Sequence, residues 1–328
     1  MTDYPGAQET PQSPSASVMN AVQAPAVLKA LAHDVRWRLV LALAQSDLRV
    51  QELVSLVREP QNLVSYHLRQ LRDAGVVEEH RSTVDARDIY YVLDLPTLQA
   101  YVAKAVNAIH PSLLDPDLLA MWATPLKPSD SSESGSSAAR ATLASLTTFA
   151  PPPMPTSPEA SEQALISLRR SFAKHGSTSL HATDTGVRVL FLCTHNSVRS
   201  QMAEGILRHL APHIEIFSAG SDPRPVHPLA ISTLQATGID IRQQRAKHVD
   251  EFRGQTFAYV ITLCDHMREA CPSFLASPAQ MHWSFPDPAE APDESGVRQR
   301  AFMQTALQLF TRIRYLLPLI QQGRLSVA

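Results

Sequence analysis

One cysteine-centred segment carries the clearest chemistry in this 328-residue chain. Cys193 and Arg199 are separated by five residues, between an apolar run over Val187–Cys193 and a helical pattern over Ser200–Leu210. A loop between a strand and a helix turns backbone N–H groups toward one point, which makes an anion cradle at the helix N-terminus. That field favours the thiolate of Cys193, a nucleophile. Arg199 is placed to clamp a tetrahedral oxyanion with two hydrogen bonds.

The residues of this loop suit an oxyanion site. Asn196 tolerates the left-handed backbone that a tight loop needs, and Ser200 falls in the first helical turn, where its hydroxyl could stabilise the thiolate. The alternative is a buried structural cysteine at the end of a strand. The predicted oxyanion-binding residues are Thr194, His195, Asn196, Ser197, Val198, Arg199 and Ser200.

Composition limits the classes of protein that remain. The three cysteines are an odd, small number, which argues against a disulfide framework and favours a reduced, cytoplasmic chain. The first 17 residues lack the pattern of a secretory signal, and no apolar run reaches the length that spans a bilayer, so no membrane partner is expected. A net charge of −2 excludes binding to nucleic acid by bulk charge, although it permits a local basic face.

The chain divides into four stretches that differ in composition and in the spacing of apolar residues. Residues 1–17 form a disordered tail, 18–120 are periodic and rich in short helices, 121–185 are a Pro/Ser-rich linker with possible short helices, and 186–328 alternate strands with helices. The alternation predicts an α/β fold with a parallel sheet and sites at the strand C-termini. Four strands are expected. The long linker makes rigid coupling between the two halves improbable.

The C-terminal half resembles the low-molecular-weight protein tyrosine phosphatase fold, a four-stranded parallel α/β structure. The resemblance is carried by the segment VLFLCTHNSVRSQMAEGIL, by SAG at 218–220 and by the pair Asp287-Pro288, and it covers about Gly186–Gln322. This fold implies two competing chemistries, arsenate reduction and phosphotyrosine hydrolysis. A third alternative is a regulator whose C-terminal domain only senses oxyanion or redox state.

The other two cysteines, Cys264 and Cys271, resemble those of thioredoxin-coupled arsenate reductases in spacing and strand-end placement. The resemblance implies that Cys193 attacks arsenate, that Cys264 attacks Cys193 to release arsenite, and that a Cys264–Cys271 disulfide is then reduced by thioredoxin. A phosphatase needs only the first thiol, and the plain alternative for the other two is small buried hydrophobes.

The same resemblance implies roles for three further residues. Asp287 matches the general acid of the phosphatase fold and would protonate the departing arsenate hydroxyl. Glu204 and Ser218 match positions that help bind a potassium ion in some relatives. No tightly bound cofactor and no metal site are otherwise expected.

The N-terminal half resembles an ArsR-type winged-helix repressor over about Gln23–Leu95, through ALAHDVRWRLVLAL, the HLRQLRDAGVV run and the final YYVL. Val50–Val57 would be the first helix of a helix-turn-helix and Gln61–Asp73 the recognition helix. Base edges would be met by its N-terminal side chains, and phosphates by arginines of the helix and wing. The predicted DNA-binding residues are Gln61, Asn62, Ser65, Tyr66, His67, Arg69, Arg72, Arg81 and Arg87.

The resemblance also implies a homodimer on operator DNA, with Leu98–Ile109 and Ala24–Leu31 as the dimer helices. One feature leaves the inducer open. Arsenite is thiophilic, yet no cysteine precedes Cys193, so this half should bind arsenite poorly.

Overall fold

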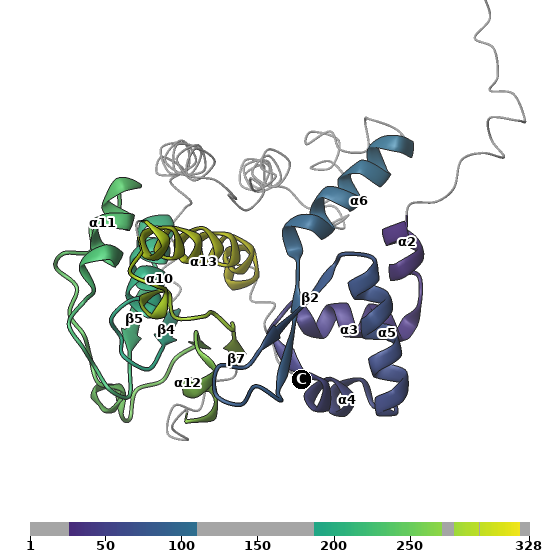
Figure 1. Cartoon of the computed structure of the whole chain (residues 1–328), viewed down its shortest axis with the longest axis horizontal. Helices are drawn as coiled ribbons and strands as arrows, with labels where there is room; N and C mark the ends of the chain where they lie inside the picture. Colours follow the sequence, from purple (N-terminus) through teal and green to yellow (C-terminus); the bar gives the residue numbers. More distant parts are fainter. Residues whose placement is uncertain (1–25, 110–186, 271–278, 295, 322–328) are drawn as a thin grey trace, which may run out of the picture.

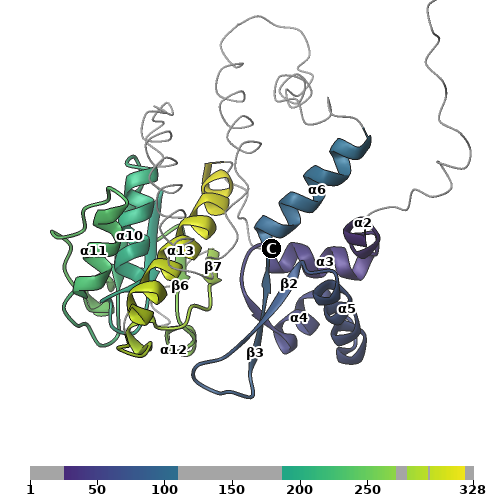
Figure 2. The ribbon, with the colours of Figure 1, turned by 45° about the horizontal axis from the view of Figure 1, so that its top comes forward.

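A computed structural model describes residues 26–109, 187–270, 279–294 and 296–321. Within them, two separate hydrophobic cores form, one in each half of the chain. The two halves lie side by side (Figures 1 and 2). The predicted N-terminal tail, the linker helices and Cys271 lie outside the described residues.

The N-terminal half is a winged helix-turn-helix. Its three strands pair antiparallel in the order β1-β3-β2, and Val64, Leu68 and Leu71 recur at helical spacing on one buried face of helix α5. Its elements are α2 (Ala26–Leu31), α3 (Asp34–Leu43), β1 (Leu48–Arg49), α4 (Val50–Val57), α5 (Gln61–Asp73), β2 (Val77–Arg81), β3 (Ile89–Leu93) and α6 (Leu95–Ile109).

Local chemistry sets the breaks between these helices. The apolar spacing predicts a single helical region over Ala24–Leu43. In the structure this region is interrupted at His33, which caps α3 by accepting a hydrogen bond from the backbone N–H of Val35 at 3.2 Å. Helix α4 ends before Arg58, whose φ of 55° is left-handed. Pro60 occupies the N-cap position of α5, and its backbone carbonyl accepts from the N–H groups of Leu63 and Val64 at 3.0 Å. Strand β1 has only two residues, too few for an alternating pattern to predict it.

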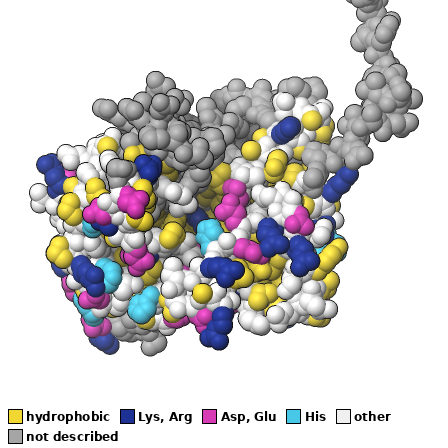
Figure 3. Space-filling model, in the orientation of Figure 1, with side chains coloured by type: hydrophobic (Ala, Val, Ile, Leu, Met, Phe, Trp, Pro, Cys, Tyr) yellow, Lys and Arg dark blue, Asp and Glu magenta, His cyan; other side chains and the backbone are white. Residues whose placement is uncertain are grey.

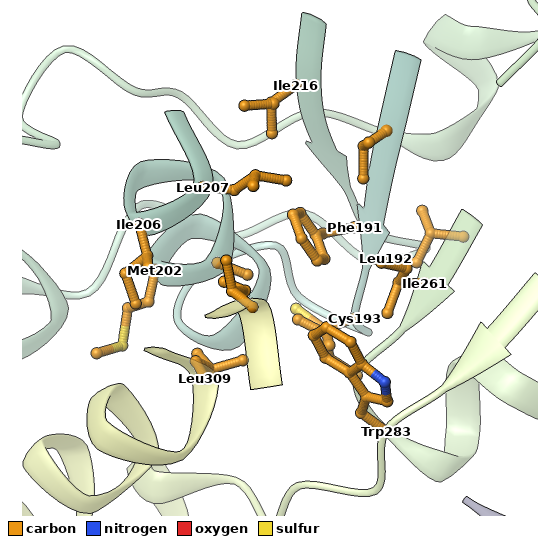
Figure 4. Close-up of a cluster of buried hydrophobic side chains, with 14 of the residues drawn as sticks. Phe191, Leu192, Cys193, Met202, Ile206, Leu207, Ile216, Ile261, Trp283 and Leu309 are labelled. Carbon is orange, nitrogen blue, oxygen red and sulfur yellow. The ribbon is translucent and has the colours of Figure 1, made fainter. Parts of the chain in front are cut away.

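The C-terminal half is an α/β domain whose four strands are all parallel, in the order β5-β4-β6-β7. This confirms the predicted four-stranded parallel sheet. Figure 4 shows the packing of side chains from strands and helices around Phe191. The elements are β4 (Arg188–Leu192), α10 (Arg199–Leu210), β5 (Glu215–Ala219), α11 (Pro228–Ala236), η2 (Val249–Phe252), β6 (Tyr259–Thr262), α12 (Asp265–Glu269), β7 (Ala279–His282), η4 (Pro288–Glu290) and α13 (Val297–Gln321).

The two halves contact each other directly, contrary to the loose tether that the linker predicted. Asp47, fully buried, pairs with Arg312 of α13 at 2.8 and 3.1 Å and accepts a hydrogen bond from the backbone N–H of Ser284 at 2.8 Å. The backbone carbonyl of His282 accepts a hydrogen bond from the backbone N–H of Asp47 at 2.8 Å. Basic, acidic and histidine side chains are intermixed on the outer face near the boundary between the halves (Figure 3). Composition alone could not predict this interface because its partners are distant in sequence.

None of the described helices is long and apolar enough to cross a membrane.

Candidate functional site

Cys193 stands at the C-terminal end of β4, where the chain turns into the loop before α10. Its backbone N–H donates to the carbonyl of Ala219 at 3.2 Å, so the start of the loop is anchored to the neighbouring strand β5. Asn196 has a φ of 43°, which confirms the predicted left-handed residue. The Cys193 side chain is buried at the margin of the hydrophobic cluster (Figure 4).

A hydroxyl group is directed at the thiol. The Cys193 Sγ and Ser200 Oγ atoms lie 3.0 Å apart, and Asn196 Nδ2 donates to the same Ser200 oxygen at 2.8 Å. Because that oxygen already accepts from Asn196, its own hydrogen is free to point at the sulfur. The short distance places the Ser200 hydroxyl where it was expected from the sequence, within hydrogen-bonding reach of the Cys193 sulfur.

The orientation of the Asn196 amide is fixed by backbone and side-chain donors. Its Oδ1 atom accepts from the backbone N–H of Lys247 at 2.8 Å and from Gln201 Nε2 at 3.0 Å, so its amino group must face Ser200. Asn196 and Gln201 are both fully buried. Gln201 and Lys247 were not identified from the sequence, because each only orients Asn196 and belongs to no motif.

Gly220 lets the loop pack closely against the end of β5. A Cβ atom at this position would lie 2.5 Å from the carbonyl oxygen of Thr194 and 2.7 Å from that of Cys193. Contacts this short do not occur, so any side chain at 220 would push the loop away. The SAG tripeptide contributes only to the family resemblance, and this steric requirement was not predicted from the sequence.

Arg199 is the buried cation of the site. One guanidinium nitrogen donates to Asp287 Oδ2 at 2.7 Å and the other to the carbonyl of Phe285 at 2.8 Å. Its Nε atom is buried and has no hydrogen-bond partner in the described part of the chain. Since buried donors are normally satisfied, this N–H suits an oxyanion ligand.

Cys264 is the second thiol beside the loop. It lies between β6 and α12, and its Sγ atom is 3.3 Å from Thr194 Oγ1. Strands β4 and β6 are parallel neighbours, so Cys193 and Cys264 emerge at the same edge of the sheet. Burial raises the pKa of the Cys264 thiol, opposed by the charge of Arg199. Both cysteines are free thiols.

The remaining side chains of the predicted oxyanion loop do not converge on the sulfur. His195 Nδ1 lies 3.2 Å from the backbone oxygen and from a carboxylate oxygen of Asp222, and Ser197 Oγ donates to the carbonyl of Pro225 at 2.7 Å. Val198 occupies the N-cap position of α10, and its side chain makes no capping hydrogen bond. These three residues can therefore serve an oxyanion through their backbone only.

The residues present do not fit a potassium site. The Glu204 carboxylate is almost fully buried and already pairs with Lys247 Nζ at 3.2 Å and with Arg208 at 2.6 Å. Its Oε2 atom also accepts from the hydroxyl of Ser218. A potassium ion would have to displace the Lys247 ammonium, so the chain supplies a cation of its own at this position.

The predicted DNA-binding face is largely exposed. Tyr66 is 55% exposed, and four of its neighbours are exposed on the same helix α5: Gln61, Asn62, Ser65 and Arg69. In the wing, Arg81 and Arg87 are exposed, and Arg87 pairs with Asp85. Arg72 pairs with Glu79 of β2.

His67 is a correction to the predicted DNA-binding set. Its side chain is 3% exposed and stacks on His33, with ring centroids 4.3 Å apart. Burial lowers the pKa of His67, with the positive charges of His33 and Arg36 adding to the effect. Because this ring is packed in the core, it does not face the exposed side of α5 that would meet base edges, so we remove His67 from the predicted interface.

Comparison with known proteins assigns both halves. Residues 188–322 match the family described as low molecular weight phosphotyrosine protein phosphatase, and residues 33–79 match the arsR family of bacterial regulatory proteins.

An arsenate reductase of Halalkalibacterium halodurans is 35% identical over 127 residues, which are 38% of this chain and 91% of that protein. An arsenate reductase of Staphylococcus aureus is 36% identical over 123 residues, which are 37% of this chain and 94% of that protein. A solved structure described as an arsenate reductase in the phosphate binding state is 30% identical, covers 40% of this chain and 97% of its own, and has a TM-score of 0.36. The chain therefore belongs to the low molecular weight phosphotyrosine protein phosphatase family, beside its arsenate reductase relatives, and carries an ArsR-family helix-turn-helix domain fused ahead of that domain.

Proposed function

We propose that this protein is an arsenate reductase fused to a transcriptional regulator, with thioredoxin as its electron donor. The supporting observation is the placement of two buried free thiols, Cys193 and Cys264, at the same sheet edge around one loop. A hydrolase of this fold needs only the first thiol. The similarity to arsenate reductases over the whole domain supports the same conclusion.

In the first step, the Cys193 thiolate attacks the arsenic of arsenate and a hydroxyl leaves. The unpartnered Nε–H of Arg199 and the backbone N–H groups of the loop hold the oxyanion. Asp287, linked to Arg199, supplies the proton with which the hydroxyl leaves as water. The product is a covalent adduct between Cys193 sulfur and As(V).

In the second step, the Cys264 thiolate attacks the Cys193 sulfur. A Cys193–Cys264 disulfide forms, the S–As bond breaks, and its electron pair reduces As(V) to As(III), which departs as arsenite. The Cys271 thiolate then attacks Cys264 and frees Cys193. The resulting Cys264–Cys271 disulfide is reduced by the two thiols of thioredoxin, which become oxidised.

The winged helix binds operator DNA as a homodimer in this proposal. Exposed polar side chains on α5 and arginines in the wing suit a helix in the major groove and a wing on the phosphates. Tyr101, Val102 and Ile109 of α6 are exposed apolar residues that suit the proposed dimer helix.

A coupled assay tests the enzyme. Purified full-length protein with thioredoxin, thioredoxin reductase and NADPH should consume NADPH only when arsenate is added, with one arsenite formed per NADPH. Absence of arsenate turnover would refute the reductase and favour the alternative of a regulator whose C-terminal domain only senses oxyanion or redox state. Hydrolysis of an aryl phosphate much faster than arsenate turnover would identify a phosphatase instead.

A further inference from the structure

Helix α12 joins the second thiol to the DNA-binding half. Cys264 is the N-cap residue of this helix, and its carbonyl accepts from the backbone N–H of Arg268 at 3.1 Å. Two side chains of the same short helix, Asp265 and Arg268, contact the winged helix. Figure 1 shows α12 beside the hairpin of β2 and β3.

Asp265 holds the wing. Its buried carboxylate accepts from the backbone N–H of Thr83 at 2.7 Å and from the Thr83 hydroxyl at 3.0 Å. Within its own domain it contacts Ser284 Oγ at 2.8 Å and His282 Nε2 at 3.1 Å. Burial alone would raise the pKa of Asp265, but these hydrogen bonds hold it well below its usual range, so the group stays a carboxylate.

Arg268 contacts the first helix of the helix-turn-helix. Its guanidinium pairs with Glu52 Oε1, while Glu52 Oε2 accepts from the backbone N–H of Arg49 at 2.7 Å and so caps α4. The residue next to Cys264 therefore holds the wing, and the residue one helical turn later holds α4. Hydrogen bonds weaken steeply with distance and angle, so a shift at Cys264 reaches both contacts.

We propose that Cys264 is the input of a transcriptional switch, in which disulfide formation at its sulfur moves α12, releases Thr83 and Glu52, and weakens operator binding. The inference rests on the proposed reductase function for its natural trigger. The electrons are those of the second step above: the two thiols are oxidised to a disulfide as As(V) becomes As(III), and thioredoxin resets the switch.

The docked state is the one that suits DNA. With both thiols free, docking fixes Thr83 in the wing but leaves Arg81, Arg87 and the polar face of α5 exposed. Releasing Thr83 would free the wing to move and lower the affinity. All three cysteines of the sequence lie in the C-terminal half, so any response of DNA binding that depends on thiol chemistry with arsenic must begin there.

Polar contacts cross the interface between the halves. They include the pairs Asp47–Arg312 and Glu52–Arg268 and the hydrogen bonds between Thr83 and Asp265, and domains joined through such interfaces commonly move relative to one another. A cavity of about 420 Å³ also lies between the halves, with Glu78 and His80 on one side and Phe285 and Arg312 on the other.

The decisive test modifies Cys264 directly. In full-length protein carrying Cys193→Ser and Cys271→Ser, Cys264 is the remaining thiol, and methyl methanethiosulfonate converts it to a methyl disulfide with loss of methanesulfinate. Fluorescence anisotropy on labelled promoter DNA should show affinity falling by at least about fivefold, the lower range of measured couplings, and dithiothreitol should restore it. Unchanged affinity of protein shown by mass spectrometry to be modified would overturn the proposal.

A second arm uses the natural trigger and does not depend on reagent access. Protein with all three cysteines, treated with arsenate without thioredoxin, should lose operator affinity in step with the loss of two thiols. Thiol loss without a change in affinity would also overturn the switch while upholding the reductase. If methyl methanethiosulfonate lowers operator affinity but the protein with all three cysteines does not reduce arsenate, the switch is upheld and the proposed reductase function is refuted.

Variants of the contacts complete the test. Arg268→Ala should lower the operator affinity of the reduced protein and reduce the further loss of affinity on oxidation, while arsenate turnover is unchanged. Asp265→Asn should have the same effects, because it weakens the contact with Thr83 in the wing. Arg242→Ala is the matched control, since that arginine pairs only locally with Asp240 and is exposed. A full response to oxidation in folded Arg268→Ala and Asp265→Asn proteins would show that α12 carries no signal.

Discussion

The loop before α10 and the helix α5 place their polar residues in opposite ways. Around the loop, Asn196, Ser200 and Gln201 are fully buried and bonded to one another or to the backbone. On α5, Asn62 and Ser65 are exposed. The first region is preorganised, so its chemistry can be derived from geometry in the free protein. The second acquires its contacts only from its partner, so its specificity must be measured with DNA present.

The strongest test of this contrast removes the nucleophile. Cys193→Ser should lower arsenate turnover by at least about 10³-fold, because loss of a nucleophile leaves only binding and electrostatic contributions. Operator affinity of the reduced protein should stay within about twofold, since the contacts of Cys193 itself, with Ser200 and with Ala219, stay within the C-terminal half. The coupled assay and anisotropy measure the two effects. Retained turnover would assign the chemistry to another group.

The next test concerns the order of the thiols. Cys271→Ser should stop the enzyme after a single turnover, with one arsenite released per chain and a Cys193–Cys264 disulfide left behind. Quenched samples, alkylated and mapped by mass spectrometry, identify the pair. Finding any other disulfide would refute the proposed relay order.

The burial of Cys264 predicts a pH dependence. Because burial raises the pKa of this thiol, it is mostly protonated near neutral pH, and its thiolate fraction grows about tenfold per pH unit below that pKa. Arsenite release in a single turnover should therefore accelerate as pH rises throughout the range from pH 6 to pH 9. Rapid-quench measurements from pH 6 to pH 9, made on protein with intact secondary structure, check this. A flat profile would mean that attack by Cys264 does not limit release.

On the DNA side, a single arginine should have a smaller effect. Arg69→Ala should weaken operator binding several-fold and reduce the slope of log affinity against log salt by about 1, as loss of one phosphate contact does. Arsenate turnover should not change. The control is again Arg242→Ala, and an unchanged salt slope would show that Arg69 meets no phosphate.

The smallest expected effect concerns the cation beside Glu204. Exchange of potassium for sodium should change turnover by less than about twofold, because Lys247 already pairs with this carboxylate. Lys247→Met should lower activity modestly and make it respond to potassium. A strong potassium response of the unaltered protein would show that the ammonium can be displaced.

The sequence predicted most helices and the four parallel strands from their apolar runs. It placed the fourth strand at Met281–Phe285, whereas β7 begins and ends earlier, at Ala279–His282. It missed β1, which is too short to show a period, and the break at His33, which depends on a side-chain cap. It also predicted a loose tether, since composition describes a linker but not the contacts between the parts it joins. The pair of Asp47 and Arg312 is 265 residues apart and has no local signal.

The same distinction applies to the sites. Cys193, Arg199 and Ser200 were predictable because a strand, a loop and a helix N-terminus follow one another in sequence. Lys247 acts on the loop through its backbone N–H, which any residue type provides, and therefore leaves no pattern. His67 was assigned to DNA because it lies in the N-terminal part of the recognition helix, but helical geometry turns it onto the core beside His33.

Gly220 has a consequence for mutational tolerance. In a library that replaces every residue and selects for growth on arsenate, position 220 should reject substitutions about as strictly as the nucleophile does, although glycine there neither reacts nor binds. The reason is steric: the space that a methyl group would fill is taken by carbonyl oxygens of the loop. Such a screen would map the edges of the anion cradle, and positions of this kind would separate residues that shape it from residues that do its chemistry.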